Sequence, residues 1–456
     1  MNLHALLAAR ADAGKPVRIG LIGAGKFASM FLAQVRTTPG FHVVAVADLA
    51  VPRAEAALAR TGWPAERVDA KGLAAALASG GTFLTEDAET LLKADGIDVI
   101  VEATGDPAAG IRHALMGIAG GKHMVMVNVE ADALAGPLLK ARASKAGLVY
   151  SLAYGDQPAL IAEQVDWARA SGFEVVAAGK GTKYRPEFHA STPDTVWGYY
   201  GLTPEAAKAG GMNPKMFNSF LDGTKSGIEM AAVANATGLT PAPGGLTFPA
   251  IGVDDLPRVL KPRAAGGALH HKGQVEVISS ERHDGGPVPR DLRWGTYVVF
   301  EAPSDYVARC FAEYGMKTDE SGRYAALYRP YHLIGLELGI SIASAALRGE
   351  ATGAPTGFRG DVVATAKRDL GAGEVLDGEG GYTVWGKLMP AEESLREAAL
   401  PIGLAQGCAL VRPVAAGAVL TRADVALEET ALAVRIRNEM ERAFGAKMLG
   451  STRAAE

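Results

Sequence analysis

The chain has 456 residues, more than one hydrophobic core usually holds, so we expect two or three domains. Hydrophobic residues make up 48% of the sequence and charged residues 21%, the balance of a globular protein. The formal net charge of −4 does not indicate nucleic acid or an anionic membrane as a partner, and two cysteines, Cys310 and Cys408, are too few for a disulfide framework.

The N-terminal segment does not read as a secretory signal. Arg10 and Asp12 interrupt its short apolar stretch, and the longer apolar runs, such as Leu338 to Leu347, fall short of a membrane span. We therefore expect a cytoplasmic protein with no membrane partner.

A dinucleotide-binding pattern opens the N-terminal third. Val17 to Ile22 is an apolar run of strand length, and Gly23-Ala24-Gly25-Lys26-Phe27-Ala28 follows it directly, before a helix-like segment at 29–35. This is G-x-G-x-x-A in the context that the motif requires, after a strand and opening a helix. Gly23 permits the tight turn, Gly25 lets the backbone approach a pyrophosphate, and Ala28 keeps the helix close to the sheet. Lys26 either adds charge to a phosphate or is a solvated surface lysine.

The next strand, His42 to Ala47, ends at Asp48, twenty residues beyond Ala28, where an acid holds the adenosine ribose. Asp48 favours the free 2′-hydroxyl of NAD, whereas Arg53 is placed to receive the 2′-phosphate of NADP. The pattern leaves both cofactors open.

Two further strands, 97–105 and 123–128, carry polar residues where they end, and such ends line the ligand crevice of a parallel sheet. Helices at Val51–Arg60 and Ile111–Ile118 complete a doubly wound parallel α/β sheet over residues 1–158. The cofactor contacts that we predict are Gly23, Gly25, Lys26, Phe27, Ala28, Asp48, Arg53, Thr104, Gly105, Asn128 and Glu130.

Residues 159–355 are predicted to form an α+β catalytic and dimerisation domain with a mixed sheet, from strands at 175–179, 273–280 and 294–300. A helix is expected to open near residue 222 and to run through Ala236. If it starts that early, Asp222, Lys225 and Glu229 share one face. Two acids flanking a lysine suit substrate binding and proton transfer, although a solvated, salt-bridging face has the same spacing.

Arg329 and His332 precede an apolar helix predicted at Leu333 to Leu347. At the N-terminal end of that helix they would suit an anionic substrate. The alternative for His332 is a buried histidine whose ring nitrogens are satisfied by the protein itself.

The last hundred residues, 356–456, are predicted to form a small all-β module followed by a helix from Glu429 to Phe444. The segment AKRDLGAGEVL at 366–376 is similar to a second segment, VRPVAAGAVL, at 411–420.

These residues make the chain resemble known families. The first 350 residues resemble the homoserine-dehydrogenase-like branch of the Rossmann oxidoreductases. The C-terminal module resembles a SAF domain, a β-clip unit, through Asp369-Leu370-Gly371-Ala372-Gly373-Glu374 and the related segment at 411–420. The combination resembles the DXR-like proteins, a second type of 1-deoxy-D-xylulose 5-phosphate reductoisomerase. The phrases that carry this resemblance are IGLIGAGKFASMF, VNVEADALAGPLL, SLAYGDQPALI, GKGTKY, FNSFLDGTKSGIEMA and YRPYHLIGLE.

The resemblance implies NADPH-dependent conversion of 1-deoxy-D-xylulose 5-phosphate to 2-C-methyl-D-erythritol 4-phosphate, a step of isoprenoid precursor synthesis. The chain departs from homoserine dehydrogenases at the Asn-Lys pair, whose lysine is catalytic in those enzymes, since Asn128-Val129 stands here. Their Asn-Gly-Thr-Thr-Asn segment corresponds to Asp222-Gly223-Thr224-Lys225-Ser226, which gains an acid and a base. Homoserine is therefore not the expected substrate.

For that reaction we expect Lys183 and Lys225 to bind phosphate or polarise oxygens, Asp222 and Glu229 to transfer protons, and Arg329 and His332 to anchor the phosphate or orient an enediol. Mg²⁺ or Mn²⁺ would act through Asp222, Glu229, Asp254 or Asp255, although no spacing requires a metal.

Two alternatives stay open. One is an NAD(P)-dependent dehydrogenase of another sugar or polyol phosphate, or a homoserine-dehydrogenase-like oxidoreductase. The other is a nicotinamide-binding sensor or carbohydrate-binding protein. The partners that we expect are a phosphorylated sugar and further copies of the chain, in a homodimer or homotetramer.

Overall fold

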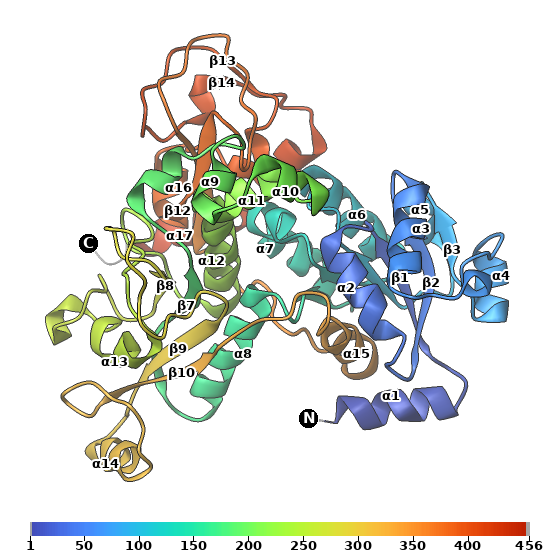
Figure 1. The fold of residues 1–456 in the computed structure, drawn as a ribbon, viewed down its shortest axis with the longest axis horizontal. Coiled ribbons are helices and arrows are strands. Elements are labelled where there is room, and N and C mark those ends of the chain that lie inside the picture. Colours follow the sequence, from blue (N-terminus) through green and yellow to red (C-terminus); the bar gives the residue numbers. More distant parts are fainter. Residues whose placement is uncertain (1, 453–456) are drawn as a thin grey trace. The chain divides into compact units, whose positions relative to one another are not determined.

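The computed structural model describes residues 2–452, which form two compact units (Figure 1). Within the described residues, the first comprises residues 2–160 and His332–Pro355, and the second comprises Ile161–Tyr331 and residues 356–452.

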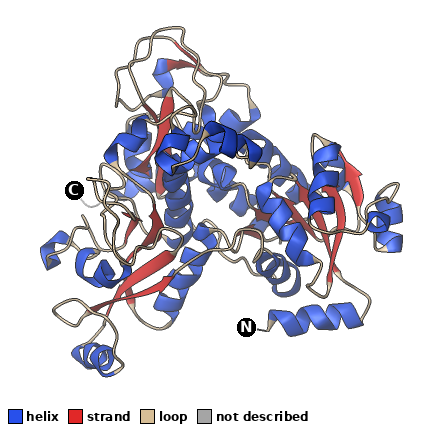
Figure 2. Ribbon diagram, viewed as in Figure 1, coloured by secondary structure: helices blue, strands red, loops and turns tan. Residues whose placement is uncertain are grey.

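The first unit is a doubly wound Rossmann fold, as predicted. Its six strands lie in the order β3-β2-β1-β4-β5-β6, and every neighbouring pair is parallel. Strands and helices alternate along this part of the chain (Figure 2). The strands are β1 (Val17–Ile22), β2 (Phe41–Ala47), β3 (Phe83–Thr85), β4 (Val99–Glu102), β5 (His123–Met126) and β6 (Tyr150–Leu152). The helices are α1 (Leu3–Asp12), α2 (Lys26–Val35), α3 (Val51–Arg60), α4 (Leu73–Ser79), α5 (Ala88–Lys93), α6 (Pro107–Ala119), α7 (Val129–Lys145) and α15 (Gly339–Arg348), with a 3-10 turn, η1, at Ala65–Arg67.

Residues 332–355 return to this first unit, although the predicted boundaries place them in the middle domain. Leu338 and Ile342 pack in the same core cluster as Ile19 and Phe31, and the Ser341 hydroxyl oxygen accepts the backbone N–H of Tyr154 at 2.8 Å. Burial of α15 on the parallel sheet explains the apolar composition of this segment.

The helix predicted at Leu333 to Leu347 is wrong over its first six residues, because α15 begins only at Gly339. Gly335 has a φ of 72°, and a Cβ there would lie 2.4 Å from the carbonyl oxygen of Phe27. The chain passes too close to α2 at this point for a regular helix with side chains on every face.

The second unit contains the predicted mixed sheet, in the order β10-β9-β7-β8. Strand β7 (Glu174–Thr182) is parallel to β8 (Gln274–Ser279) and antiparallel to β9 (Thr296–Glu301), which pairs with β10 (Tyr324–Arg329). The α-helices within residues 161–331 are α9 (Val196–Tyr200), α10 (Pro204–Ala209), α11 (Pro214–Leu221), α12 (Thr224–Thr237), α13 (Leu256–Val259) and α14 (Asp305–Glu313). The 3-10 turns are η2 (Pro186–Ala190), η3 (Val253–Asp255) and η4 (Arg263–Ala265). Helix α8 (Gln157–Ala170) includes the position in the sequence at which the first unit ends and the second begins.

The C-terminal residues of this unit pack a β-ribbon against α12. Strands β11 (Gly360–Ala366) and β12 (Val384–Pro390) form the ribbon, and twelve of the fourteen residues of α12 are buried. The side chain of Asn235 on α12 accepts the backbone N–H of Arg359 at 2.6 Å. A helix that is apolar on most faces needs such cover on several sides.

The two related phrases of the C-terminal module pair with each other. Leu370 and Val414 exchange backbone hydrogen bonds of 2.9 and 3.0 Å, in an antiparallel bridge. The module is not purely β, as it contains α16 (Ala391–Arg396) beside β13 (Ala409–Leu410), β14 (Val425–Ala426) and two 3-10 turns, η5 (Ile402–Leu404) and η6 (Arg422–Asp424). The predicted final helix is present as α17 (Leu432–Thr452).

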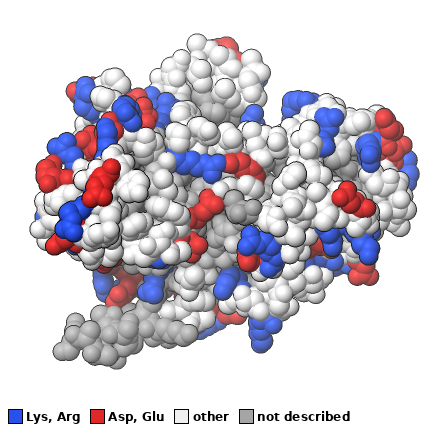
Figure 3. Space-filling model, turned by 90° about the horizontal axis from the view of Figure 1, so that it is seen from below, with Lys and Arg blue, Asp and Glu red and all other residues white. Residues whose placement is uncertain are grey.

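Acidic and basic side chains are interspersed over the face that Figure 3 shows. Of the helices between residues 2 and 452, none combines the length and the apolar character that a membrane crossing needs.

Candidate nucleotide and catalytic sites

The glycine loop of the first unit holds two glycines in different environments. Gly23 has a φ of 95°, and a Cβ there would lie 2.6 Å from the carbonyl oxygen of Ala103, so the fold itself requires glycine. Gly25 has a φ of −74°, which any residue adopts, and a Cβ there would have no neighbour within 4 Å. The space beside Gly25, at the start of α2, is therefore left open by the protein, and it fits a phosphate group against a helix N-terminus.

Asp48, which follows β2, is hydrogen-bonded to this loop. Its buried carboxylate accepts the N–H of Ala24 at 2.8 Å and the N–H of Ala50 at 2.9 Å. Arg53, which is 61% exposed, lies with its Nε 3.5 Å from the same carboxylate. The structure thus brings the predicted acid and arginine together beside the loop. Each Asp48 oxygen keeps a second lone pair for a ribose hydroxyl.

The ends of β4 and β5 carry the other predicted cofactor residues. Thr104 and Gly105 are exposed there. Asn128 is buried, and its side chain accepts the N–H of Ala131 at 3.0 Å as the N-cap of α7 while donating to the carbonyl of Asp106 at 2.8 Å. Asn128 therefore holds two strand-to-helix connections in place.

The other predicted cofactor residues lie at the start of the helices beside these strand ends. Lys26 is exposed, Phe27 is half-buried and Ala28 is buried at the first turn of α2. Glu130 is half-buried in the first turn of α7.

Sequence reasoning missed a buried polar chain beneath Thr104. The Thr104 hydroxyl donates to Glu102 at 2.6 Å, and Glu102 lies 3.1 Å from Nδ1 of the buried His113. The available signal was Glu102 itself, a charged residue that ends an otherwise apolar strand.

In the second unit, Asp222 does not share a helix face with Lys225 and Glu229. Helix α12 begins at Thr224, and Asp222 precedes it, accepting the N–H of Thr224 at 2.9 Å. The other carboxylate oxygen of Asp222 lies 2.8 Å from the ammonium of Lys367, and both side chains are almost fully buried. Burial raises the pKa of Asp222, and the ammonium of Lys367 opposes that rise. Lys367 was missed because only folding brings the C-terminal module to this position.

Glu229 also has a buried cationic partner, Lys180 on β7. Lys225 is half-buried in the first turn of α12. The predicted cluster therefore contains two buried ion pairs, and the alternative of a solvated face does not describe it.

The remaining candidates lie in separate surroundings. Lys183 donates to the carbonyl of Tyr199 at 2.7 Å and lies 2.9 Å from Glu281. Arg329 is the last residue of β10 in the second unit, whereas His332 belongs to the first unit.

The four carboxylates proposed for a metal are not gathered into one site. Asp254 pairs with Arg290 and Lys317, and Asp255 lies 3.7 Å from Arg258. Within residues 2–452, no group of three or more His, Cys, Asp or Glu side chains is arranged to hold a metal ion.

His189 is a further residue that sequence reasoning missed. Its ring stacks on Trp385 at a centroid distance of 3.8 Å. Its Nδ1 lies 2.7 Å from the carbonyl oxygen of Asp222, and its Nε2 lies 3.0 Å from the Tyr184 hydroxyl. Burial lowers the pKa of His189 and raises that of Tyr184 to about 12. These shifts favour a neutral imidazole that donates from Nδ1 and accepts the tyrosine O–H at Nε2.

Comparison with protein families matches residues 155–338 to the model described as "Oxidoreductase DRL, catalytic domain". No curated protein matches the chain at a significant level.

The chain is similar over part of its length to several solved structures of dehydrogenases and reductases. The myo-inositol dehydrogenase of Lactobacillus casei is 16% identical, with 40% of this chain and 50% of that chain covered and a TM-score of 0.29. A putative myo-inositol dehydrogenase of Sinorhizobium meliloti is 14% identical, with 73% and 90% covered and a TM-score of 0.38. The 3-ketoreductase KijD10 of Actinomadura kijaniata is 20% identical, with 38% and 50% covered and a TM-score of 0.26. The chain thus spans about half the length of the first and third of these proteins.

Proposed function

We propose that the protein is a nicotinamide-dependent oxidoreductase that acts on a phosphorylated sugar or polyol. The observation that carries this proposal is the open space beside Gly25 in a Rossmann sheet, where neither backbone conformation nor packing requires glycine. The match of residues 155–338 to an oxidoreductase catalytic domain supports a redox reaction.

The cofactor would be held by the first unit. The pyrophosphate would lie against Gly25 and the first turn of α2, and the adenosine ribose against Asp48. The cofactor, when bound, supplies or accepts a hydride. The chain's own residues bind it, orient it and exclude water from the reacting carbon.

Asp222 and Lys225 differ in burial, and we assign them different roles for that reason. Asp222 has no exposed surface and is neutralised by Lys367, so we assign it as a positioning residue for the start of α12. Lys225 is half-buried at the same helix start and stays the candidate for binding or polarising a substrate oxygen.

A second candidate is reductoisomerisation of 1-deoxy-D-xylulose 5-phosphate. It is favoured by the phrases GKGTKY, FNSFLDGTKSGIEMA and YRPYHLIGLE, which fall within the range matched by the DRL catalytic domain.

An assay of NADPH oxidation separates the two candidates. The purified protein is given 1-deoxy-D-xylulose 5-phosphate, and the product is identified by mass spectrometry and NMR. 2-C-methyl-D-erythritol 4-phosphate as product supports the reductoisomerase. Turnover only of other sugar or polyol phosphates, without skeletal rearrangement, supports the dehydrogenase. Absence of any nucleotide binding would contradict both.

Arg53 tests the choice between NADPH and NADH. Its guanidinium is exposed beside Asp48, where the 2′-phosphate of NADPH would lie. We expect Arg53→Ala to weaken NADPH binding by about tenfold, the loss of one charge-assisted contact, and to leave NADH affinity nearly unchanged. Fluorescence titration of both nucleotides measures the two dissociation constants. Equal losses would show that Arg53 does not contact the 2′-phosphate.

A further inference from the structure

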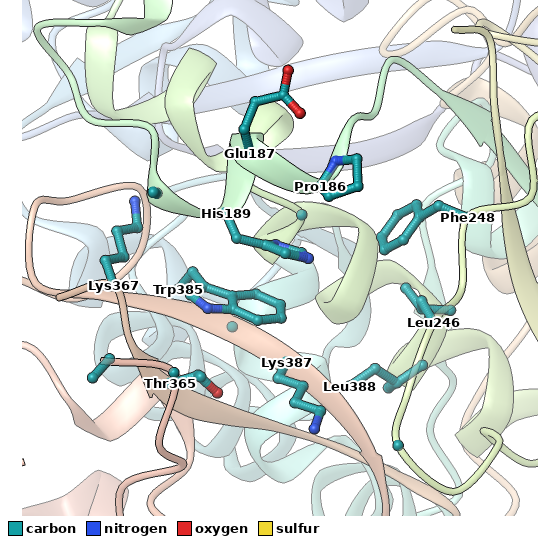
Figure 4. Close-up of a pocket in the computed structure, with 16 residues that line it drawn as sticks. Pro186, Glu187, His189, Leu246, Phe248, Thr365, Lys367, Trp385, Lys387 and Leu388 are labelled. Atoms are coloured by element: carbon teal, nitrogen blue, oxygen red, sulfur yellow. The ribbon is translucent and has the colours of Figure 1, made fainter. Parts of the chain in front are cut away.

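A cavity of about 410 Å³ lies within the second unit, between the η2 turn, the loop 244–248 and the β11–β12 ribbon (Figure 4). It is lined by His189, Phe248, Thr365, Trp385 and Lys387, among others. The volume falls at the lower end of the range for small-molecule sites. The C-terminal module therefore supplies one wall of a half-open pocket in addition to covering α12.

The cavity contains a cation whose charge the protein does not balance. Lys387 is half-buried, and among the described residues its ammonium has neither an ion pair nor a hydrogen bond. Lys367 also borders the cavity, but its ammonium already has protein partners. It forms an ion pair with Asp222 at 2.8 Å and donates to the carbonyls of Ser191 and Gly381 at 2.7 Å each. Lys387 is thus the group that an anion would neutralise.

The wall of the cavity also holds a buried hydroxyl without a partner. Thr365 is only 2% exposed, and its Oγ1 makes no hydrogen bond to any described residue. It lies directly opposite Trp385 in the β11–β12 register, so both side chains border the same space. A buried hydroxyl that is left unpaired costs stability, and a ligand that bonds it removes that cost.

The other walls are aromatic and held in place by stacking. Trp385 stacks on His189, and Phe248 stacks on Tyr184 with ring centroids 3.9 Å apart. Figure 4 draws the Trp385, His189 and Phe248 rings and the Lys387 side chain among the residues that line the cavity. Ordered rings present apolar surface to a ligand without a further loss of side-chain entropy on binding.

We propose that this cavity binds a small organic anion, with its charged group on Lys387, a polar atom on the Thr365 hydroxyl and an apolar face against Trp385 and Phe248. A phosphate and a carboxylate share this chemistry. The proposal concerns a site in the second unit and does not depend on the nicotinamide reaction, since ligand binding here needs no hydride.

Isothermal titration calorimetry of the full chain tests the proposal. Ribose 5-phosphate and gluconate are the two anionic probes, and ribose is the neutral control. We expect saturable binding of at least one anion and none of ribose, and the stronger anion identifies the charged group. Lys387→Met should weaken that binding at least tenfold, whereas Lys208→Met, at an exposed lysine of α10, should leave it unchanged. Absence of binding by both anions, or equal affinity in Lys387→Met, would overturn the proposal.

Thr365→Val separates a ligand contact from a structural role. The substitution keeps the shape of the side chain and removes the unpaired hydroxyl, so we expect a melting temperature that is unchanged or higher and an anion affinity several-fold lower. A lower melting temperature with unchanged affinity would contradict the assignment. Gly25→Val should bind the anion normally, so failure of the nucleotide proposal and failure of this one give different results.

Discussion

Gly23 and Gly25 are two residues apart in one loop, yet glycine is needed at each for a different reason. At Gly23 the positive φ and the carbonyl of Ala103 exclude a side chain, so the requirement comes from the fold. At Gly25 neither condition applies, so the requirement comes from whatever binds there.

Gly25→Val should therefore fold normally and fail to bind NADPH, with affinity reduced by at least about a hundredfold because valine methyls occupy the place of the pyrophosphate. Circular dichroism measures folding and fluorescence titration measures binding. Gly23→Val is the contrasting variant, which we expect to be destabilised. Unchanged NADPH affinity in Gly25→Val would remove the nucleotide site from this loop.

Asp132 on α7 makes the stability of the first unit depend on pH. Its carboxyl is fully buried and accepts the hydroxyl of Tyr150 at 2.9 Å. Burial raises the pKa of Asp132 from 3.8 to about 7, with the Tyr150 hydrogen bond opposing the rise. Between these two values the unfolded chain releases a proton that the folded state retains, so the contribution of Asp132 to stability is present at low pH and is lost as pH rises towards 7.

Asp132→Asn should remove the decrease in folding stability that the wild type shows as pH rises. From pH 4 to pH 8 the wild type should lose on the order of 4 kcal/mol relative to the variant, because one pKa unit corresponds to about 1.4 kcal/mol. Urea unfolding at the two pH values measures the difference, and the exposed Asp69→Asn is the control. Parallel pH profiles for the wild type and Asp132→Asn would show that Asp132 is ionised in the folded protein.

At the scale of elements, one buried arginine attaches α17 to the β11–β12 ribbon. The guanidinium of Arg437 is fully buried, donates to both oxygens of Asp361 at 3.1 and 2.6 Å and to Glu441 at 2.7 Å, and lies 4.9 Å from the centre of the Phe358 ring. Bidentate geometry and full burial make this pair unlike a surface salt bridge.

Arg437→Met should lower the free energy of unfolding by about 3–5 kcal/mol, since it leaves Asp361 buried without its cation. Arg435→Met, two residues earlier on the exposed side of α17, should change it by less than about 0.5 kcal/mol. Chemical denaturation of both variants measures the two values. Similar small effects would mean that packing alone holds α17.

At the scale of the whole molecule, the C-terminal module stabilises elements that precede it in the chain by more than a hundred residues. Lys367 neutralises Asp222 at the start of α12, and the backbone N–H of Gly386 donates to the Thr224 hydroxyl at 2.8 Å. Residues 161–331 and 356–456 accordingly form one compact unit.

Lys367→Met should raise hydrogen exchange at residues 222–230 by about a hundredfold, because the unpaired Asp222 carboxylate destabilises the start of α12. Strands β1 and β2 of the first unit should exchange at the wild-type rate. Mass spectrometry of peptic fragments reads both regions, and Arg368→Met is the exposed control. An increase confined to the C-terminal module would show that the two parts of the second unit unfold independently.

Local pattern was sufficient for the parallel sheet of the first unit. The strand, glycine loop, helix and strand-end acid are adjacent in sequence, and a parallel sheet necessarily brings them to one edge, so the glycine loop and Asp48 lie beside each other as their spacing indicated. That Gly23, Gly25 and Asp48 contact a nucleotide stays a prediction. The existence of a helix ending near Ala236 and the repeated phrase of the C-terminal module were likewise visible in the chain.

Tertiary structure decided everything that depends on partners distant in sequence. Asp222 read as an exposed acid on a helix face, but Lys367 reaches it from the C-terminal module, and burial turns the two into a structural pair. The segment after His332 read as the start of a helix, but close passage over α2 at Gly335 delays the helix to Gly339. Spacing along a chain specifies which residues share a face, whereas burial and ion pairing depend on what packs against that face, which only the folded chain specifies.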